Sequence, residues 1–147
     1  MSTLSELYEQ DLYAWTLRTT ELLRQRRFDE LDVEHLAEEL ETMSRCDRHE
    51  LISHLKKLLG HLLKWQFQPH YRSSSWHGSI VEQRLRVNDL LQFNPSLKPF
   101  LAEAMTMAYP DAVTLAVRET GLLQQTFPKH CPYDALQFLE DNFFPEQ

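Results

Sequence analysis

A stretch of 36 residues, Val33 to Gln68, contains no proline and a single glycine. Nothing inside it terminates a helix, and as one helix it would be about 54 Å long. That is longer than a small domain is wide, so the rest of the chain must fold around it. Pro69 ends the stretch, because the residue before a proline is pushed out of the helical region. We therefore expect one very long central helix over about residues 33–68.

Apolar side chains follow one face of this stretch, with an interruption near Asp47. They recur at helical spacing on both sides of it: Val33, Leu36, Ala37, Leu40, Met43, Leu51, Leu55, Leu58, Leu59 and Leu62. Either the helix bends near Asp47 or two helices meet at residues 45–48. The absence of glycine and proline there favours a single helix.

The remaining chain also has helical patterns. Thr3 and Glu6 form a capping box at the start of a helix expected to reach about residue 25. Further helices are expected over about 75–91, 97–120 and 133–142, with Pro110 either kinking or dividing the third of these. No stretch alternates with period two for long enough to predict a strand. The sequence therefore predicts an all-α fold, a single-domain helical bundle over residues 1–147.

The composition predicts a cytoplasmic protein without a membrane-spanning segment. No run approaches 18 apolar residues, so no membrane span is expected, and the acidic, polar start is unlike a secretory signal. Cys46 and Cys131 are far apart and form no Cys-x-x-Cys pair, which favours free thiols in a reducing compartment.

Charge is distributed unevenly along the chain. The net charge is −7, which argues against nucleic-acid binding by the whole surface. Residues 45–86 nevertheless carry eight Lys and Arg against three acids, a net of +5, while the remainder carries −12. Such a basic segment can mark a binding surface, or the two segments can neutralise each other in the fold.

The basic segment contains the best-formed candidate site, which we call the cationic edge. Helical spacing places His61, Lys64 and Trp65 on one polar edge beside the apolar face. A short connection then folds the next helix back toward them. The full set is His61, Lys64, Trp65, Arg72, Trp76 and Arg84. Cations beside indole rings suit a phosphate, a carboxylate or a stacked base, but the same set can also be a packing seam between helices.

Three carboxylates, Glu38, Glu39 and Glu119, are candidates to pair with this edge.

His54 and His61 are two helical turns apart, roughly 10 Å, which is too far for both to bind one metal ion. We therefore predict no metal site and no cofactor. Cys46, Cys131 and the serines at 73–75 show no arrangement typical of nucleophilic catalysis.

Several phrases of the sequence resemble the bacterial family catalogued as domain of unknown function twenty-nine. They occur in order as LYEQDLYAWTLRTTELLR, LDVEHLAEELETM, LLGHLLKWQFQPHYRSSSW, EQR, NPSLKPFL, ETGL and FPKHCPY, covering nearly the whole chain. The resemblance implies an all-helical fold and a bacterial origin, and it implies no activity. His54 departs from the family pattern, where arginine is more common, which favours a cationic or packing role there.

These observations favour a non-catalytic binding module whose cationic edge receives an anionic group of a partner. The alternative is a metal-assisted phosphodiesterase or nuclease that uses His61 with a nearby carboxylate. A third possibility is that Phe138, Phe143 and Phe144, or the apolar face of the first helix, dock another chain. We expect a protein partner or self-association, regard nucleic acid as a weaker candidate, and expect no membrane partner.

Overall fold

The computed structural model describes residues 3–146, and the chain divides into two compact units. The N-terminal unit comprises Met1–Cys46 and the C-terminal unit comprises Asp47–Gln147. Among residues 3–146 there is no strand, so the all-α fold is confirmed. That residues 1–147 form a single domain stays a prediction. No helix in this part of the chain is both long enough and apolar enough to cross a bilayer.

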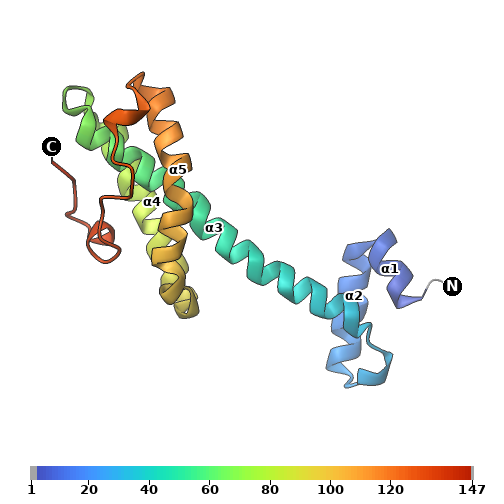
Figure 1. Cartoon of the computed structure of the whole chain (residues 1–147). Helices are drawn as coiled ribbons and strands as arrows, with labels where there is room; N and C mark the ends of the chain where they lie inside the picture. The colour runs from blue at the N-terminus through green and yellow to red at the C-terminus, as the bar shows by residue number, and fades with distance from the viewer. Residues whose placement is uncertain (1–2, 147) are drawn as a thin grey trace. The chain divides into compact units, whose positions relative to one another are not determined.

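The long helix predicted from the sequence is present and unbroken. Helix α3 extends over Val33–Phe67, through Asp47 and the expected weak point at residues 45–48 (Figure 1). Its first part belongs to the N-terminal unit and its second part to the C-terminal unit.

The helix predicted over residues 3–25 is in fact two helices, α1 (Leu4–Gln10) and α2 (Leu12–Arg24). Asp11 causes the break. Its backbone N–H donates to the carbonyl of Leu7 at the end of α1, and its carboxylate accepts from the N–H of Ala14 at the start of α2. A side chain that caps the start of a new helix competes with continuation of the previous one. The apolar residues keep the same helical spacing on both sides of Asp11, so the spacing does not indicate the break. The capping box at Thr3 is confirmed.

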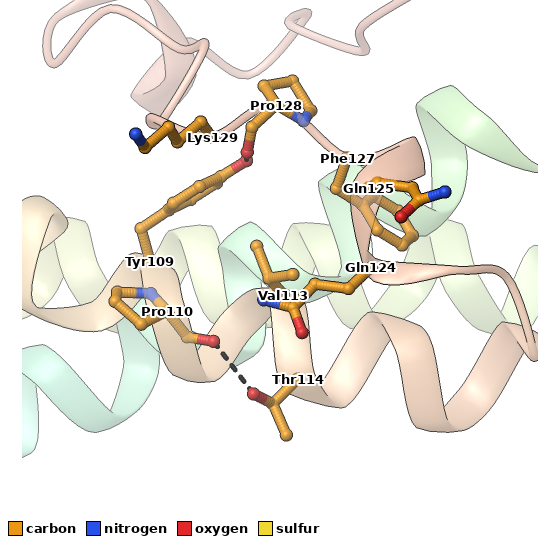
Figure 2. A pocket seen from close by; sticks show the side chains of 9 residues that line it. All are labelled: Tyr109, Pro110, Val113, Thr114, Gln124, Gln125, Phe127, Pro128 and Lys129. Carbon is orange, nitrogen blue, oxygen red and sulfur yellow. Dashed lines mark hydrogen bonds between the residues drawn. The ribbon is translucent and has the colours of Figure 1, made fainter.

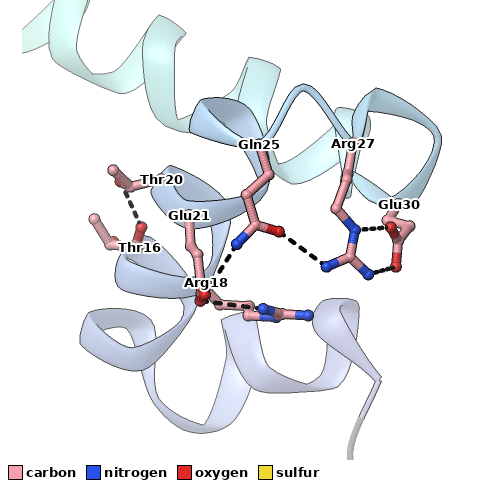
Figure 3. A network of polar contacts seen from close by, with 7 residues as sticks. All are labelled: Thr16, Arg18, Thr20, Glu21, Gln25, Arg27 and Glu30. Carbon is pink, nitrogen blue, oxygen red and sulfur yellow. Dashed lines mark hydrogen bonds and ion pairs between the residues drawn. The ribbon is translucent and has the colours of Figure 1, made fainter.

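Charged and amide side chains tie the end of α2 to the turn that follows (Figure 3). Arg18 pairs with Glu21 at 3.1 Å, and the Gln25 amide donates to the same carboxylate at 3.3 Å. Arg27 donates to the side-chain oxygen of Gln25 at 3.0 Å and to both carboxylate oxygens of Glu30. These groups are largely exposed, so each contributes little to stability.

The N-terminal unit buries little apolar surface. Trp15, Thr19 and Leu22 of α2 are its buried side chains among the described residues. Large apolar side chains remain exposed on α2, on the turn and on α3: Leu12, Tyr13, Leu17, Leu23, Phe28, Val33, Leu40 and Met43. The apolar face of α3 that the sequence predicts is therefore exposed at Val33, Leu40 and Met43.

The C-terminal unit contains the main core. The second part of α3 packs with α4 (Ser74–Phe93) and α5 (Leu101–Thr120) around a continuous set of buried side chains. Leu55, Leu58 and Leu62 of α3 are fully buried there. A Cβ built on Gly60 would lie 3.5 Å from the Ala112 carbonyl oxygen, so α3 and α5 approach closely at this point.

The prolines at 95 and 110 have different effects on the predicted fourth helix. Pro95–Phe100 forms a 3₁₀ turn, so the fourth predicted helix begins only at Leu101. Pro110 neither ends nor divides α5. The hydroxyl of Thr114 donates to the Pro110 carbonyl at 3.1 Å.

The final helix predicted over residues 133–142 is wrong. This region has one short 3₁₀ turn at Gln137–Leu139. The Asp134 carboxylate accepts from the N–H groups of Leu136 and Gln137, which offers the backbone an alternative to helix. Beyond the turn, the carbonyls of Asp141 and Phe143 accept hydrogen bonds from the Arg84 side chain of α4 instead of from helical N–H groups.

Candidate functional site

The ends of three helices bring Lys64, Trp76 and Glu119 together. Lys64 lies in the last turn of α3, Trp76 in the first turn of α4 and Glu119 near the end of α5. The Lys64 ammonium pairs with the Glu119 carboxylate and lies 5.0 Å from the centre of the Trp76 ring. Lys64 is 5% exposed, whereas the Glu119 side chain is 54% exposed. The acid is therefore the solvent-facing member of this pair.

A small pocket opens beside Glu119. Its volume is about 230 Å³, and it is lined by Gln68, Tyr71, Trp76, Glu119 and Thr120. We call it the Glu119 pocket. It combines two aromatic rings, an amide, a hydroxyl and a carboxylate, which is the chemistry that holds a cation or a hydrogen-bond donor.

His61 lies one turn before Lys64 on α3 and is half-buried. Its Nδ1 atom is buried without a hydrogen-bond partner among the described residues. Burial lowers the pKa of the His61 imidazole, the positive charge of Lys64 lowers it further, and Glu119 opposes this effect. Burial and Lys64 thus both favour the neutral form of the ring.

Trp65 and Arg72 form a second contact of the cationic edge. The Arg72 Nε donates to the Trp65 backbone carbonyl at 2.7 Å, and the guanidinium lies 5.0 Å from the centre of the Trp65 ring. Another Arg72 nitrogen is 3.5 Å from the Pro145 carbonyl oxygen. Arg72 thus contacts both the end of α3 and the segment near the end of the chain.

Arg84 is 2% exposed, and all three of its guanidinium nitrogens donate to backbone carbonyls. The acceptors are Phe138 at 3.1 Å, Asp141 at 2.9 Å and Phe143 at 2.6 Å. Burial lowers the pKa of Arg84, against the nearby charge of Asp141. Arg84 is therefore a packing and tethering residue, which is the packing role that the sequence left open.

The candidate carboxylates Glu38 and Glu39 belong to the N-terminal unit. The Tyr8 hydroxyl donates to Glu39 at 2.6 Å. This hydrogen bond, with a smaller contribution from burial and nearby acids, raises the pKa of Tyr8 to about 12. Glu38 is exposed. Among residues 3–146, no three His, Cys, Asp or Glu side chains are grouped so that they could hold a metal ion.

A larger pocket of about 720 Å³ lies between α5 and the loop at residues 124–129 (Figure 2). The Tyr109 hydroxyl donates to the Pro128 carbonyl at 2.6 Å, which ties this loop to α5. Burial, with the nearby Cys131, raises the pKa of Tyr109 to about 12. None of the residues that line this pocket was predicted as a site residue.

Sequence reasoning missed several groups around the cationic edge. His77 stacks on Phe144, with ring centres 4.6 Å apart, and Tyr71 lines the Glu119 pocket. Because His77 directly follows Trp76, the sequence could have placed it near the cationic edge, in the first turn of α4. Nothing in the spacing indicates that Phe144 would return to it.

Comparison with known proteins gives one family. The family model described as "Domain of unknown function DUF29" matches residues 7–144. Neither the curated proteins nor the solved structures contain a match to the chain.

Proposed function

Since the chain belongs to the DUF29 family, whose description names no activity, we propose from this site alone that it is a binding module. It takes up a basic side chain, lysine or arginine, of a partner protein in the Glu119 pocket. The observation that carries this proposal is the half-exposed Glu119 carboxylate in the wall of a pocket that Trp76 and Tyr71 also line.

The position of the charges supports a basic ligand. Lys64 is buried beneath the acid and already neutralises part of it, yet more than half of the Glu119 side chain is open to solvent. A guanidinium or ammonium can reach that carboxylate and form a charge-assisted hydrogen bond. A bound anion would have to displace Glu119 from Lys64, and an acid fixed on the same chain competes at high effective concentration.

The aromatic rings support the same conclusion. A cation over the face of an indole or phenol ring is attracted by the ring quadrupole. Lys64 already makes this contact with Trp76, and the exposed Tyr71 offers a second ring at the pocket wall. The other cations of the edge, Arg72 and Arg84, donate to backbone carbonyls of the chain itself.

The net charge of −7 favours the approach of a basic partner over an acidic one. The anionic partner expected from the sequence stays a prediction, and an acidic probe therefore serves as the alternative ligand in the test. Removing the Glu119 charge should weaken binding of a basic ligand and strengthen binding of an acidic one.

Glu119→Gln separates them. We expect N-acetyl-arginine amide to bind the wild type and to bind Glu119→Gln about tenfold more weakly, because a neutral amide loses the charge-assisted bond. Glu82→Gln is the matched control, since Glu82 is an exposed acid paired with Arg86 on α4. Isothermal titration measures all three proteins, with N-acetyl-glutamate amide as the acidic probe.

The opposite result would overturn the proposal. If removal of the Glu119 charge frees Lys64 for an anion, Glu119→Gln will bind the acidic probe more tightly than the wild type binds the basic one. Equal binding of the basic probe to wild type and Glu119→Gln would also exclude this pocket.

A further inference from the structure

The N-terminal unit carries an exposed apolar stripe on α3. Val33, Leu40 and Met43 are 63%, 58% and 62% exposed, and Ala37 is exposed as well. At 100° per residue these four side chains project within about 120° of one another, along roughly 15 Å of helix. We call these four residues the α3 stripe. A stripe of this width is typical of a helix face that packs against another element.

Helix α1 covers a different side of α3. The Tyr8 ring stacks on His35, with ring centres 3.9 Å apart, and the Tyr8 hydroxyl donates to Glu39 at 2.6 Å. Helical spacing makes His35 and Glu39 project at least about 100° away from Leu40, which lies at the middle of the stripe. The packing of α1 therefore leaves the α3 stripe open to solvent.

A row of acids borders the α3 stripe. Glu34, Glu38 and Glu41 are exposed, and helical spacing places them side by side next to Ala37. In the part of the chain that the structure describes, none of the three forms a salt bridge with lysine or arginine. Glu34 complements the helix dipole in the first turn, but that effect does not extend to Glu38 and Glu41. The two later acids are therefore available to a partner.

The N-terminal unit also carries most of the negative charge of the protein. Residues 1–46 contain eleven acids and five arginines, a net of −6, out of −7 for the whole chain. A second copy would bring an equally acidic unit to the stripe, and like charges brought together across an interface cost free energy. A partner with lysine or arginine beside an apolar face meets the opposite charge. The charges therefore favour a basic partner over self-association.

The regular backbone of α3 selects the shape of that partner. Inside a helix the N–H and C=O groups bond to one another, so α3 offers no free backbone edge to a strand. A second helix can place apolar side chains at i, i+3, i+4 and i+7 against the stripe and basic side chains at its border.

We propose that the α3 stripe and its acidic border are a docking site for a basic amphipathic helix of a partner protein. The apolar side chains of that helix cover the stripe, and its lysines or arginines pair with Glu38 and Glu41. The inference is independent of the Glu119 pocket, because every residue of the stripe and its border belongs to the N-terminal unit.

The first test uses the full chain and an acetylated, amidated peptide of sequence ALKALLKKLKALLKAL, which as a helix has leucine on one face and lysine beside it. We expect the wild type to bind this peptide and Leu40→Ser to bind it at least about tenfold more weakly, because the peptide then covers a polar group. Leu85→Ser is the matched control, since Leu85 on α4 is 54% exposed, and it should bind as the wild type does.

A second pair of variants tests the acidic border. Glu38→Gln combined with Glu41→Gln should weaken binding about tenfold, because two charge-assisted contacts become neutral. Glu103→Gln combined with Asp89→Asn changes the net charge equally at exposed acids of the C-terminal unit, and it should change the affinity by less than about twofold. The peptide with every lysine replaced by glutamate should not bind.

Isothermal titration gives the affinities, and circular dichroism checks helix content, with Leu40→Ala in place of Leu40→Ser if that variant loses helix. Equal binding by wild type and Leu40→Ser, or equal effects of the two acid pairs, would overturn the inference. Binding that only Glu119→Gln weakens would place the peptide in the Glu119 pocket and would overturn it as well. Light scattering that shows a wild-type dimer dissociated by Leu40→Ser would place a second copy on the stripe, which also contradicts the inference.

Discussion

A single arginine illustrates how a residue that suits ligand binding can serve the fold instead. Arg84 has the chemistry of an anion-binding residue, but it is buried and its three nitrogens face carbonyls. Each of those carbonyls would lose its partner if the guanidinium were removed. A buried acceptor left without a donor costs about 1–3 kcal/mol.

Arg84→Ala should therefore lower the free energy of unfolding by about 3 kcal/mol. Arg86→Ala provides the matched control two residues further along α4, because its side chain is exposed and pairs with the exposed Glu82 at 3.6 Å. That change should stay within about 0.5 kcal/mol of wild type. Urea unfolding measures both, and equal effects would show that Arg84 does not hold residues 138–143 in place.

Part of the candidate site follows from the sequence at this scale. Lys64 and Trp76 could be placed together because a short connection turns α4 back toward α3, and Glu119 was a candidate acid. The partners of Arg84 and Arg72 could not be predicted. Arg84 bonds to backbone carbonyls 54 to 59 residues away, and Arg72 bonds to one carbonyl 73 residues away as well as to that of Trp65. Carbonyls carry no signature in the sequence.

At the scale of elements, α3 passes through two environments with one apolar pattern. Leu58 is fully buried in the C-terminal unit, while Leu40 on the same helix is 58% exposed in the N-terminal unit. Periodicity predicts a face but not what covers it. The helix itself, its length and its continuity through Asp47 were predictable, because no glycine or proline interrupts that region.

Two substitutions compare these environments directly. Leu58→Ala should cost about 2–5 kcal/mol of unfolding free energy, because it removes buried methyl groups and leaves a cavity. Leu40→Ala should change stability by less than about 0.5 kcal/mol, because its side chain is already in water. Thermal or urea unfolding checks both. A large loss for Leu40→Ala would show that its face is covered in solution.

Two elements were wrong for a shared physical reason. Asp11 divides the first helix, and Asp134 bonds the backbone of the region where a final helix was expected. In both places a carboxylate side chain accepts from nearby backbone N–H groups and so competes with continuous helix. Apolar spacing does not register that competition.

At the scale of the whole molecule, the two units differ in how much they bury. The large core cluster lies in the C-terminal unit, whereas the N-terminal unit buries Trp15, Thr19 and Leu22 among the described residues. Local opening free energy follows buried contacts. Neither the sequence pattern nor the charge distribution indicated this difference.

Hydrogen exchange should therefore separate the units. Amides of α1 and α2 should exchange at lower opening free energy than amides of α4 and α5, because fewer apolar contacts oppose their opening. Mass spectrometry of exchanged peptides measures this along the chain. Equal protection of α2 and α5 would indicate that another surface covers the N-terminal unit.

The central claim is that the Glu119 pocket binds a basic side chain, and nuclear magnetic resonance of the tryptophan indole N–H groups tests it most directly. Titration with N-acetyl-arginine amide should move the Trp76 signal to saturation and leave Trp15, in the N-terminal unit, in place. Glu119→Gln should need about tenfold more of the probe to reach the same shift. A Trp76 signal that stays still with the arginine probe, or that moves with N-acetyl-glutamate amide instead, would contradict the account.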